Sequence, residues 1–256
     1  YLSFAVAQKE PTRSDFTDRY KFAADDTYPS SEKLYDWELG YQYTAPRLSL
    51  GVNLYYMKYK DQLVPTGMVN DDSNALNTNV PDSYRRGVEL SASWRATGWF
   101  TVGANATFSQ NRIENYVDAL KDSPTYGKEL GDMTIAYSPD VIANAFLNFH
   151  HRGFEAVFHT QHVGKQYFTN NENDALSLDA YCVTNLNLAY TFRTRSARSV
   201  RLGLLINNLF NAEYESNGYG YSYMDTWSGP APVRIDEAYY FPQAPLNVLA
   251  NVTVKF

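Results

Sequence analysis

The sequence has only one cysteine in 256 residues, which excludes a disulfide framework and any metal site built from several cysteines. It has no apolar run near the roughly 18 residues that a membrane-spanning helix needs. Basic residues are in the minority, 22 against 28 acidic ones, so a nucleic-acid partner is not expected. No Gly-x-Ser-x-Gly, His-Glu-x-x-His or phosphate-binding loop occurs, and we therefore expect no enzyme.

Apolar and small polar residues alternate through much of the chain, most clearly at its end. A β-strand crosses a bilayer in about 9–11 residues, of which only every second must be apolar. The alternation therefore predicts strands with one apolar and one polar face. The apolar face of the last eleven residues comprises Leu246, Val248, Ala250, Val252, Val254 and Phe256; the other face comprises Asn247, Asn251, Thr253 and Lys255, with Leu249 as the exception.

The pattern predicts ten strands whose connections alternate in length. Short turns on one rim and long loops on the other are typical of an outer-membrane β-barrel. We therefore expect an all-β, transmembrane antiparallel barrel. The strands are expected over residues 1–8, 33–44, 48–62, 84–96, 99–112, 135–149, 154–168, 178–192, 199–215 and 237–256. The turns are expected at 45–47, 97–98, 150–153 and 193–198, and the loops at 9–32, 63–83, 113–134, 169–177 and 216–236.

The two faces of these strands differ in chemistry. The polar face is rich in Asn, Thr, Ser, Gly and Gln, which suit a hydrated lumen. Aromatic residues gather at the strand ends, where they would form the two interfacial girdles of a barrel. The short-turn girdle would contain Trp94, Trp99, Phe149, Phe154, Phe192 and Phe256, and the long-loop girdle Tyr56, Tyr59, Tyr84, Tyr167 and Phe168.

Periodicity alone leaves open a complete ten-stranded barrel, but several motifs together resemble the C-terminal half of TonB-dependent outer-membrane receptors. Each motif is modest, and their order and spacing carry the resemblance. They are SFAVAQKEPTR at 3–13, SEKLYDWELGY at 31–41, NLYYMKYKDQL at 53–63, YRRGVEL at 84–90, INNLFNAEY at 206–214 and YYFPQAP at 239–245, running into Phe256.

The resemblance implies that residues 1–256 are the last ten strands of a barrel of about 22 strands with a plug in its lumen. The plug, the earlier strands and the TonB box that engages the TonB complex would lie outside this sequence. A half-barrel leaves two unpaired edges, so we expect the chain to exist alongside the rest of its receptor. The other implied partners are the barrel-assembly machinery and outer-membrane lipid.

In function, the resemblance implies an outer-membrane receptor of a Gram-negative bacterium that imports a scarce, large solute. A ferric siderophore is the first choice; cobalamin, haem, or a glycan or peptide are alternatives. The family often has arginine where Leu246 stands, which leaves the subfamily open. The rivals from other classes are a complete ten-stranded outer-membrane protease and a passive porin.

The expected loop at 216–236 supplies most of the candidate ligand-binding residues. Aromatic faces beside an arginine would suit a bulky, partly aromatic and partly anionic ligand. Packing within the loop is the alternative role. The candidates are Tyr219, Tyr221, Tyr223, Trp227 and Arg234, together with Arg112 near another loop.

Two further features resemble structural signals of the family rather than ligand contacts. The terminal aromatic Phe256, with its alternating approach, resembles the signal that the barrel-assembly machinery reads. The run 207–211 is expected in the middle of a strand, where its asparagine amides would support hydrogen bonds.

No cofactor and no metal site is expected. His150 and His151 fall in a short turn, and His159 and His162 lie on opposite faces of one strand, so the latter two cannot chelate together. Acidic runs at 70–74 and 170–174 are explained by turn formation more simply than by calcium binding. Cys182 is expected to be a small lipid-facing residue.

Overall fold

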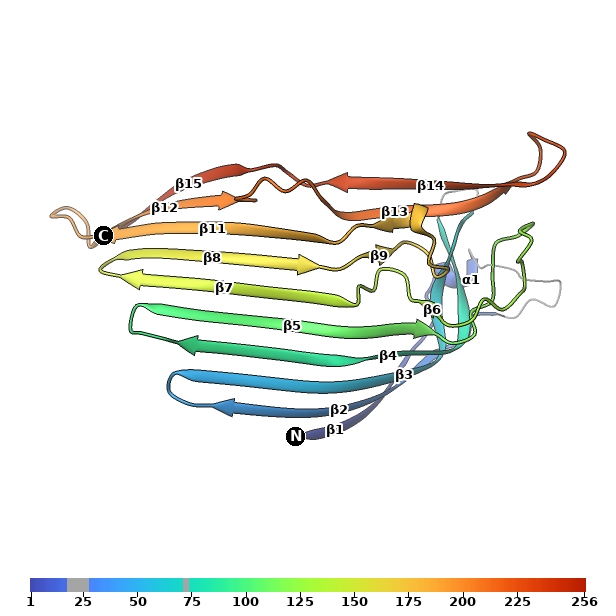
Figure 1. Ribbon diagram of the computed structural model, residues 1–256, viewed down its shortest axis with the longest axis horizontal. Helices are drawn as coiled ribbons and strands as arrows, with labels where there is room; N and C mark the ends of the chain where they lie inside the picture. The colour runs from blue at the N-terminus through green and yellow to red at the C-terminus, as the bar shows by residue number, and fades with distance from the viewer. Residues whose placement is uncertain (18–27, 71–73) are drawn as a thin grey trace.

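The computed structural model describes residues 1–17, 28–70 and 74–256. Ten antiparallel strands follow one another in chain order in one long curved sheet (Figure 1). Within the described residues, the edge strands of this sheet do not pair with each other. The strands are β1 (Leu2–Lys9), β2 (Glu32–Thr44), β3 (Leu48–Val69), β4 (Ala75–Arg95), β5 (Phe100–Ile113), β7 (Val141–His151), β8 (Phe154–Val163), β11 (Tyr181–Phe192), β12 (Ser199–Asn207) and β15 (Asn247–Lys255).

The remaining elements belong to the long connections. β6 (Met133–Thr134) pairs with the end of β5. A two-stranded pair, β9 (Gln166–Tyr167) and β10 (Ser177–Leu178), encloses the 3-10 turn η1 (Asp174–Leu176). A second pair is the hairpin of β13 (Glu215–Asp225) and β14 (Val233–Pro242), and the short helix α1 (Arg13–Thr17) follows β1. No helix in the described part of the chain is long and apolar enough to cross a membrane.

The register of the sheet confirms the predicted alternation. Leu54, Val88, Phe108 and Val141 form one transverse row on the apolar face. Three residues along these strands, Asn105 and Asn144 are partners on the polar face, and their side-chain amides hydrogen-bond at 3.2 Å. Apolar residues of the wall are largely uncovered by protein, as Val252 is 65% exposed. Such a face needs hydrocarbon as its solvent.

The expected loop at 63–83 is wrong, because β3 and β4 continue through most of it as a hairpin. The backbone of Asp61 has φ +54, and beyond this bend the hairpin leaves the direction of the wall (Figure 1). Val64 and Val80 from the hairpin pack with Ile113, Tyr116 and Ile135 in a buried cluster. Burial against the neighbouring loop therefore stabilises strand structure in a segment without apolar alternation.

The strands expected over 199–215 and 237–256 are each interrupted. Asn208 and Asn211 have φ +50 and +51, the left-handed region that asparagine tolerates better than most residues. The Asn208 side chain donates to the Ala212 carbonyl at 2.8 Å and accepts from the Ala212 amide at 2.8 Å. Asn211 accepts from the Leu246 amide at 2.8 Å, which ties the break in one strand to the break in the other. Asn207 thus ends β12 and residues 208–211 form a turn rather than mid-strand, in which the Asn208 and Asn211 side chains make the hydrogen bonds.

The expected loop at 216–236 is also wrong, because most of it is the β13–β14 hairpin. Two other strands are shorter than expected: β7 begins at Val141 and β8 ends at Val163. The four short connections, at 45–47, 96–99, 152–153 and 193–198, lie together at one end of the sheet (Figure 1). The long connections lie at the other end, as predicted.

Candidate ligand-binding hairpin

The β13–β14 hairpin has one face of small residues and one face of aromatic residues. Along β13, Gly218, Gly220 and Ser222 alternate with Tyr219, Tyr221 and Tyr223. The small face packs on the buried cluster of Phe168, Leu176 and Leu178. A Cβ on Gly220 would lie 2.9 Å from Leu176 Cδ2, so only glycine permits this approach without displacement. The tyrosines consequently face away from the cluster.

The tyrosines form a stacked ladder across the hairpin. The rings of Tyr219 and Tyr239 are stacked, with their centroids 4.9 Å apart and an interplanar angle of 13°. Tyr221 stacks on both Tyr239 and Tyr223, each with a centroid separation of 6.4 Å. Tyr219 is 46% exposed and Tyr239 is 44% exposed. Their accessible rings can therefore stack on an incoming aromatic group.

The carboxylate of Glu237 accepts hydrogen bonds from three tyrosine hydroxyls of this ladder. Tyr221 and Tyr239 donate to Glu237 Oε2 at 2.7 and 2.8 Å, and Tyr223 donates to Oε1 at 3.2 Å. The hydrogen bond from Tyr221, followed by that from Tyr239, lowers the pKa of Glu237. The bond to Glu237 in turn raises the pKa of Tyr221. At neutral pH the ladder thus carries one negative charge among neutral phenols.

The hairpin brings only part of the candidate set together. Tyr219, Tyr221 and Tyr223 share the exposed face, whereas Arg234 lies on the opposite face. There its Nε is 2.8 Å from Asp236 Oδ1 and its Nη2 donates to Ser222 Oγ at 3.1 Å. The tip residue Trp227 is 79% exposed, and its backbone amide donates to the Asp225 carboxylate at 3.0 Å.

Arg112 lies elsewhere, near the end of β5. Its guanidinium forms an ion pair with Glu172 and donates to Thr134 Oγ1 at 2.6 Å. These bonds tie the β8–β11 connection to β6. Burial raises the pKa of Glu172, but the hydrogen bonds from Thr134 outweigh this effect, so the pKa is lowered. Arg112 therefore serves as a link between loops in this structure.

Sequence reasoning missed Glu237 and Tyr239, which complete the ladder. The signal was present, because small and aromatic residues alternate strictly over 218–223, a period of two that predicts a strand. A strand in that position needs a partner, and 233–242 would have supplied one.

The acidic run at 170–174 has structural roles in the described residues. The buried Asn170 side chain accepts from the Ala136 amide at 2.7 Å and donates to the Pro65 carbonyl at 2.6 Å. Asn173 caps η1 through the Ala175 amide. Part of the other run, residues 71–73, lies outside the described residues. No group of three or more His, Cys, Asp or Glu suited to a metal occurs in the described part of the chain.

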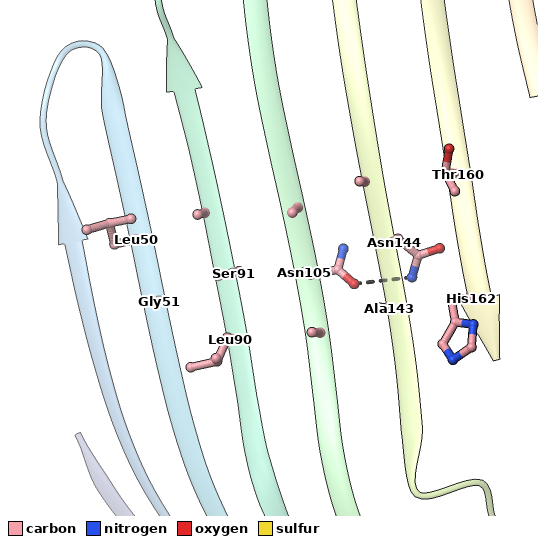
Figure 2. A pocket seen from close by; sticks show the side chains of 13 residues that line it. Leu50, Gly51, Leu90, Ser91, Asn105, Ala143, Asn144, Thr160 and His162 are labelled. Atoms are coloured by element: carbon pink, nitrogen blue, oxygen red, sulfur yellow. Dashed lines mark hydrogen bonds between the residues drawn. The ribbon is translucent and has the colours of Figure 1, made fainter. Parts of the chain in front are cut away.

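A shallow groove of about 480 Å³ lies on the wall, away from the hairpin (Figure 2). Its lining includes the alanines of β4, β5 and β7, with Leu50 and Leu90 on one side and Thr160 and His162 on the other. Nine of the thirteen lining residues belong to the apolar face by register, and Gly51, Ser91, Asn105 and Asn144 are their neighbours on the polar face. The exposed Cys182, whose partner is His162, also belongs to the apolar face. The groove therefore opens where lipid is expected rather than toward a ligand path.

Comparison with known proteins identifies the family. The family model described as TonB dependent receptor-like, beta-barrel, matches residues 1–209. The ferric yersiniabactin uptake receptor FyuA from Yersinia pestis is 18% identical, with a TM-score of 0.66 over 100% of this chain and 34% of that chain. The ferric-catecholate import receptor Fiu from E. coli K12 is 18% identical, with a TM-score of 0.65 over 98% of this chain and 32% of that chain.

The copper transporter OprC is 19% identical, with a TM-score of 0.67 over 100% of this chain and 37% of that chain. This chain thus spans about a third of the length of the solved structures it matches. The family consists of transport receptors of the outer membrane and not of enzymes, which removes the protease reading. The chain belongs to the β-barrel domain family of the TonB-dependent receptors.

Proposed function

We propose that the receptor of which residues 1–256 form the C-terminal barrel portion imports a ferric siderophore across the outer membrane with energy from the TonB complex. The observation that carries this proposal is the exposed tyrosine ladder on the β13–β14 hairpin, at the long-loop end of the wall. Stacked, accessible phenol rings suit a ligand with aromatic iron-chelating groups. FyuA and Fiu, which resemble this chain in fold, are named as iron receptors.

The negative charge of the ladder further restricts which ligands it can bind. Glu237 accepts hydrogen bonds and repels negative charge, so the part of the ligand that meets it should present amide or hydroxyl donors. Arg234 is already paired with Asp236 on the other face and is less suited to hold an anion. We propose Tyr219, Tyr221, Tyr223 and Trp227 as ligand contacts, with Arg234 and Arg112 as supports of the surrounding loops.

Copper and haem fit the described residues less well. Copper transport favours sulfur ligands, yet Met57, Met68, Met133 and Met224 are spread over three strands, β3, β6 and β13, and Cys182 lies on the apolar face. Haem ligation would draw on histidines, and His159 and His162 point to opposite faces of β8. Cobalamin, glycan or peptide import remains the alternative outcome of the experiment below.

The proposal includes the partners that the family implies. The plug and earlier strands of the receptor would meet the edges β1 and β15, and the TonB complex would act through the plug. The barrel-assembly machinery would recognise Phe256, which is 93% exposed at the end of the chain. Replacing Phe256 with Ala should slow the appearance of folded receptor in the outer membrane, and an unchanged rate would contradict this role.

Uptake measurements test which class of ligand the receptor imports. A strain lacking the receptor should lose uptake of one class among ⁵⁵Fe-loaded catecholate, phenolate and hydroxamate siderophores. The intact receptor should restore it, and the Tyr219→Ala/Tyr239→Ala variant should restore it with at least about tenfold weaker half-saturation. The control, Tyr41→Ala/Tyr43→Ala, removes two exposed tyrosines from β2 of the wall and should transport normally. Uptake of cobalamin alone, or of no iron complex, would overturn the proposal.

A further inference from the structure

Positive charge is concentrated at the short-turn end of the molecule. This rim consists of residues 44–48, 95–100, 151–154, 192–199 and 255–256, which are the four hairpin turns with their flanking residues and the chain end. The rim contains no Asp or Glu, so all 28 acidic residues and the other 15 of the 22 basic residues lie elsewhere. Its seven cations are Arg47, Arg95, Arg152, Arg193, Arg195, Arg198 and Lys255, and all seven are exposed.

None of the seven rim cations has a carboxylate partner among the described residues, whereas several cations at the other end do. At the long-loop end, Lys58 lies 2.9 Å from Asp82 and Lys165 lies 2.5 Å from Asp174. The acid nearest the rim, Glu155, is held by both Nη atoms of Arg201, at 2.8 and 2.7 Å. The described rim therefore presents uncompensated positive charge to whatever lies beside it.

The rim continues directly from the aromatic girdle. Trp94 precedes Arg95, Phe192 precedes Arg193, and Phe256 follows Lys255. Aromatic rings at the end of a barrel wall lie at the level of the lipid headgroups. Cations next to them reach the depth of the lipid phosphates, and long basic side chains extend readily to that level.

A groove of about 850 Å³ shows how these cations converge. Arg152, Arg193, Arg198 and Lys255 line it together with Phe192 and Phe256. Guanidinium groups bind phosphate through paired N–H donors, and the rings provide an apolar border for the glycerol and acyl part of a lipid. The groove thus combines the two kinds of contact that a phospholipid headgroup requires.

We propose that the short-turn rim binds the headgroups of anionic phospholipids in the periplasmic leaflet of the outer membrane. Short turns face the periplasm in outer-membrane barrels, which assigns the leaflet. The cations occur in all four hairpin turns and at the chain end. These turns follow one another along the whole arc of the wall (Figure 1). A surrounding layer of lipids matches this distribution, whereas a protein partner would select one segment of the arc. Clustered basic residues at a membrane surface attract anionic lipids.

The test compares lipids around the intact receptor in nanodiscs. Spin-labelled phosphatidylglycerol and phosphatidylcholine are the probes, and the motionally restricted fraction of each measures its association with the protein. The wild type should prefer phosphatidylglycerol, and high salt should weaken the preference. The Arg193→Gln/Arg195→Gln/Arg198→Gln variant should reduce the preference at least about twofold.

The control carries the same charge change at the other end. Lys9→Gln/Lys121→Gln/Lys128→Gln replaces three exposed cations there and should leave the preference unchanged. Should the triple arginine variant fail to assemble, the single Arg195→Gln variant, in an exposed turn, should give a smaller loss in the same direction. An unchanged preference in both arginine variants, or an equal loss in the control, would overturn the proposal. So would equal association of the two lipids with the wild type, which would point to an acidic protein instead.

Discussion

The wall and the long-loop end of this molecule are built from the same strands, but the side chains of the two regions have different surroundings. In the wall, β3, β4 and β5 alternate apolar and polar residues, and the described residues leave the apolar face largely exposed. Beyond Asp61, β3 and β4 instead bury Val64 and Val80 against Ile113 and Tyr116. The comparison teaches that one continuous strand can depend on lipid at one end and on a protein core at the other.

Removing a core side chain should affect the long-loop end most. Ile113 is fully buried, so Ile113→Ala should destabilise that end by about 2–5 kcal/mol. Hydrogen exchange in residues 61–82 and 113–136 should rise while exchange in the wall stays constant. Ile142→Ala, in a wall position that is 38% exposed, is the matched control. Equal protection losses in both variants would remove the distinction between the two regions.

A charge on the apolar face of the wall should have a slightly smaller effect. Leu90→Arg places a guanidinium in hydrocarbon and should cost about 2–4 kcal/mol, reducing the heat-modifiable folded fraction in lipid vesicles. The neighbouring variant Ser91→Arg points to the polar face and should fold nearly as the wild type does. If the two variants behaved alike, the assignment of the faces would be wrong.

Overpacking beneath the tyrosine ladder should be milder. Gly220→Ala brings a Cβ within 2.9 Å of the Glu237 carbonyl, Leu176 and Phe168, and should cost about 1–3 kcal/mol. The hairpin should shift and ligand binding, measured by fluorescence quenching, should weaken. Gly98→Ala is the control, because a Cβ at that short turn meets no atom within 4 Å. Wild-type affinity in Gly220→Ala would argue that the ladder does not depend on its support.

The smallest expected effect is a pH dependence confined to the hairpin. The pKa of Glu237 is lowered in the folded state by the bond from Tyr221. Its contribution to stability is therefore complete above the unfolded value of about 4.3 and is lost as pH falls through the folded pKa. Exchange in residues 215–242, corrected for intrinsic rates, should rise below that pH in the wild type. In Glu237→Gln this step should be absent, and its persistence would assign it to another group.

The transmembrane strands could be predicted because lipid enforces a simple pattern. Val88 and Phe108 are apolar while Glu89 and Thr107 beside them are polar, and this period of two fixes both strand and face. The breaks at Asn208 and Asn211 could not be predicted in this way, because an asparagine fits a polar strand face as well as a left-handed turn. The distinction depends on bonds to Ala212 and Leu246, which only the folded chain brings together.

The candidate site was only partly predictable for a similar reason. Tyr219, Tyr221 and Tyr223 are conspicuous in the sequence, and they do share a face. Their partners Glu237 and Tyr239 follow from the pairing of β13 with β14, a contact that periodicity in one segment does not contain. Arg234, close to the tyrosines in sequence, is separated from them by the alternation of the strand itself.

By itself, the sequence determined the wall: its ten strands, their two faces and the rim of short basic turns follow from a period of two and from charge. The reason is that bilayer and water act on every residue of a strand locally and uniformly. Only the tertiary structure decided the long-loop end. There each side chain is surrounded by other parts of the chain: Gly220 packs against Leu176, and Asn170 hydrogen-bonds to Pro65. No local sequence pattern encodes those partners.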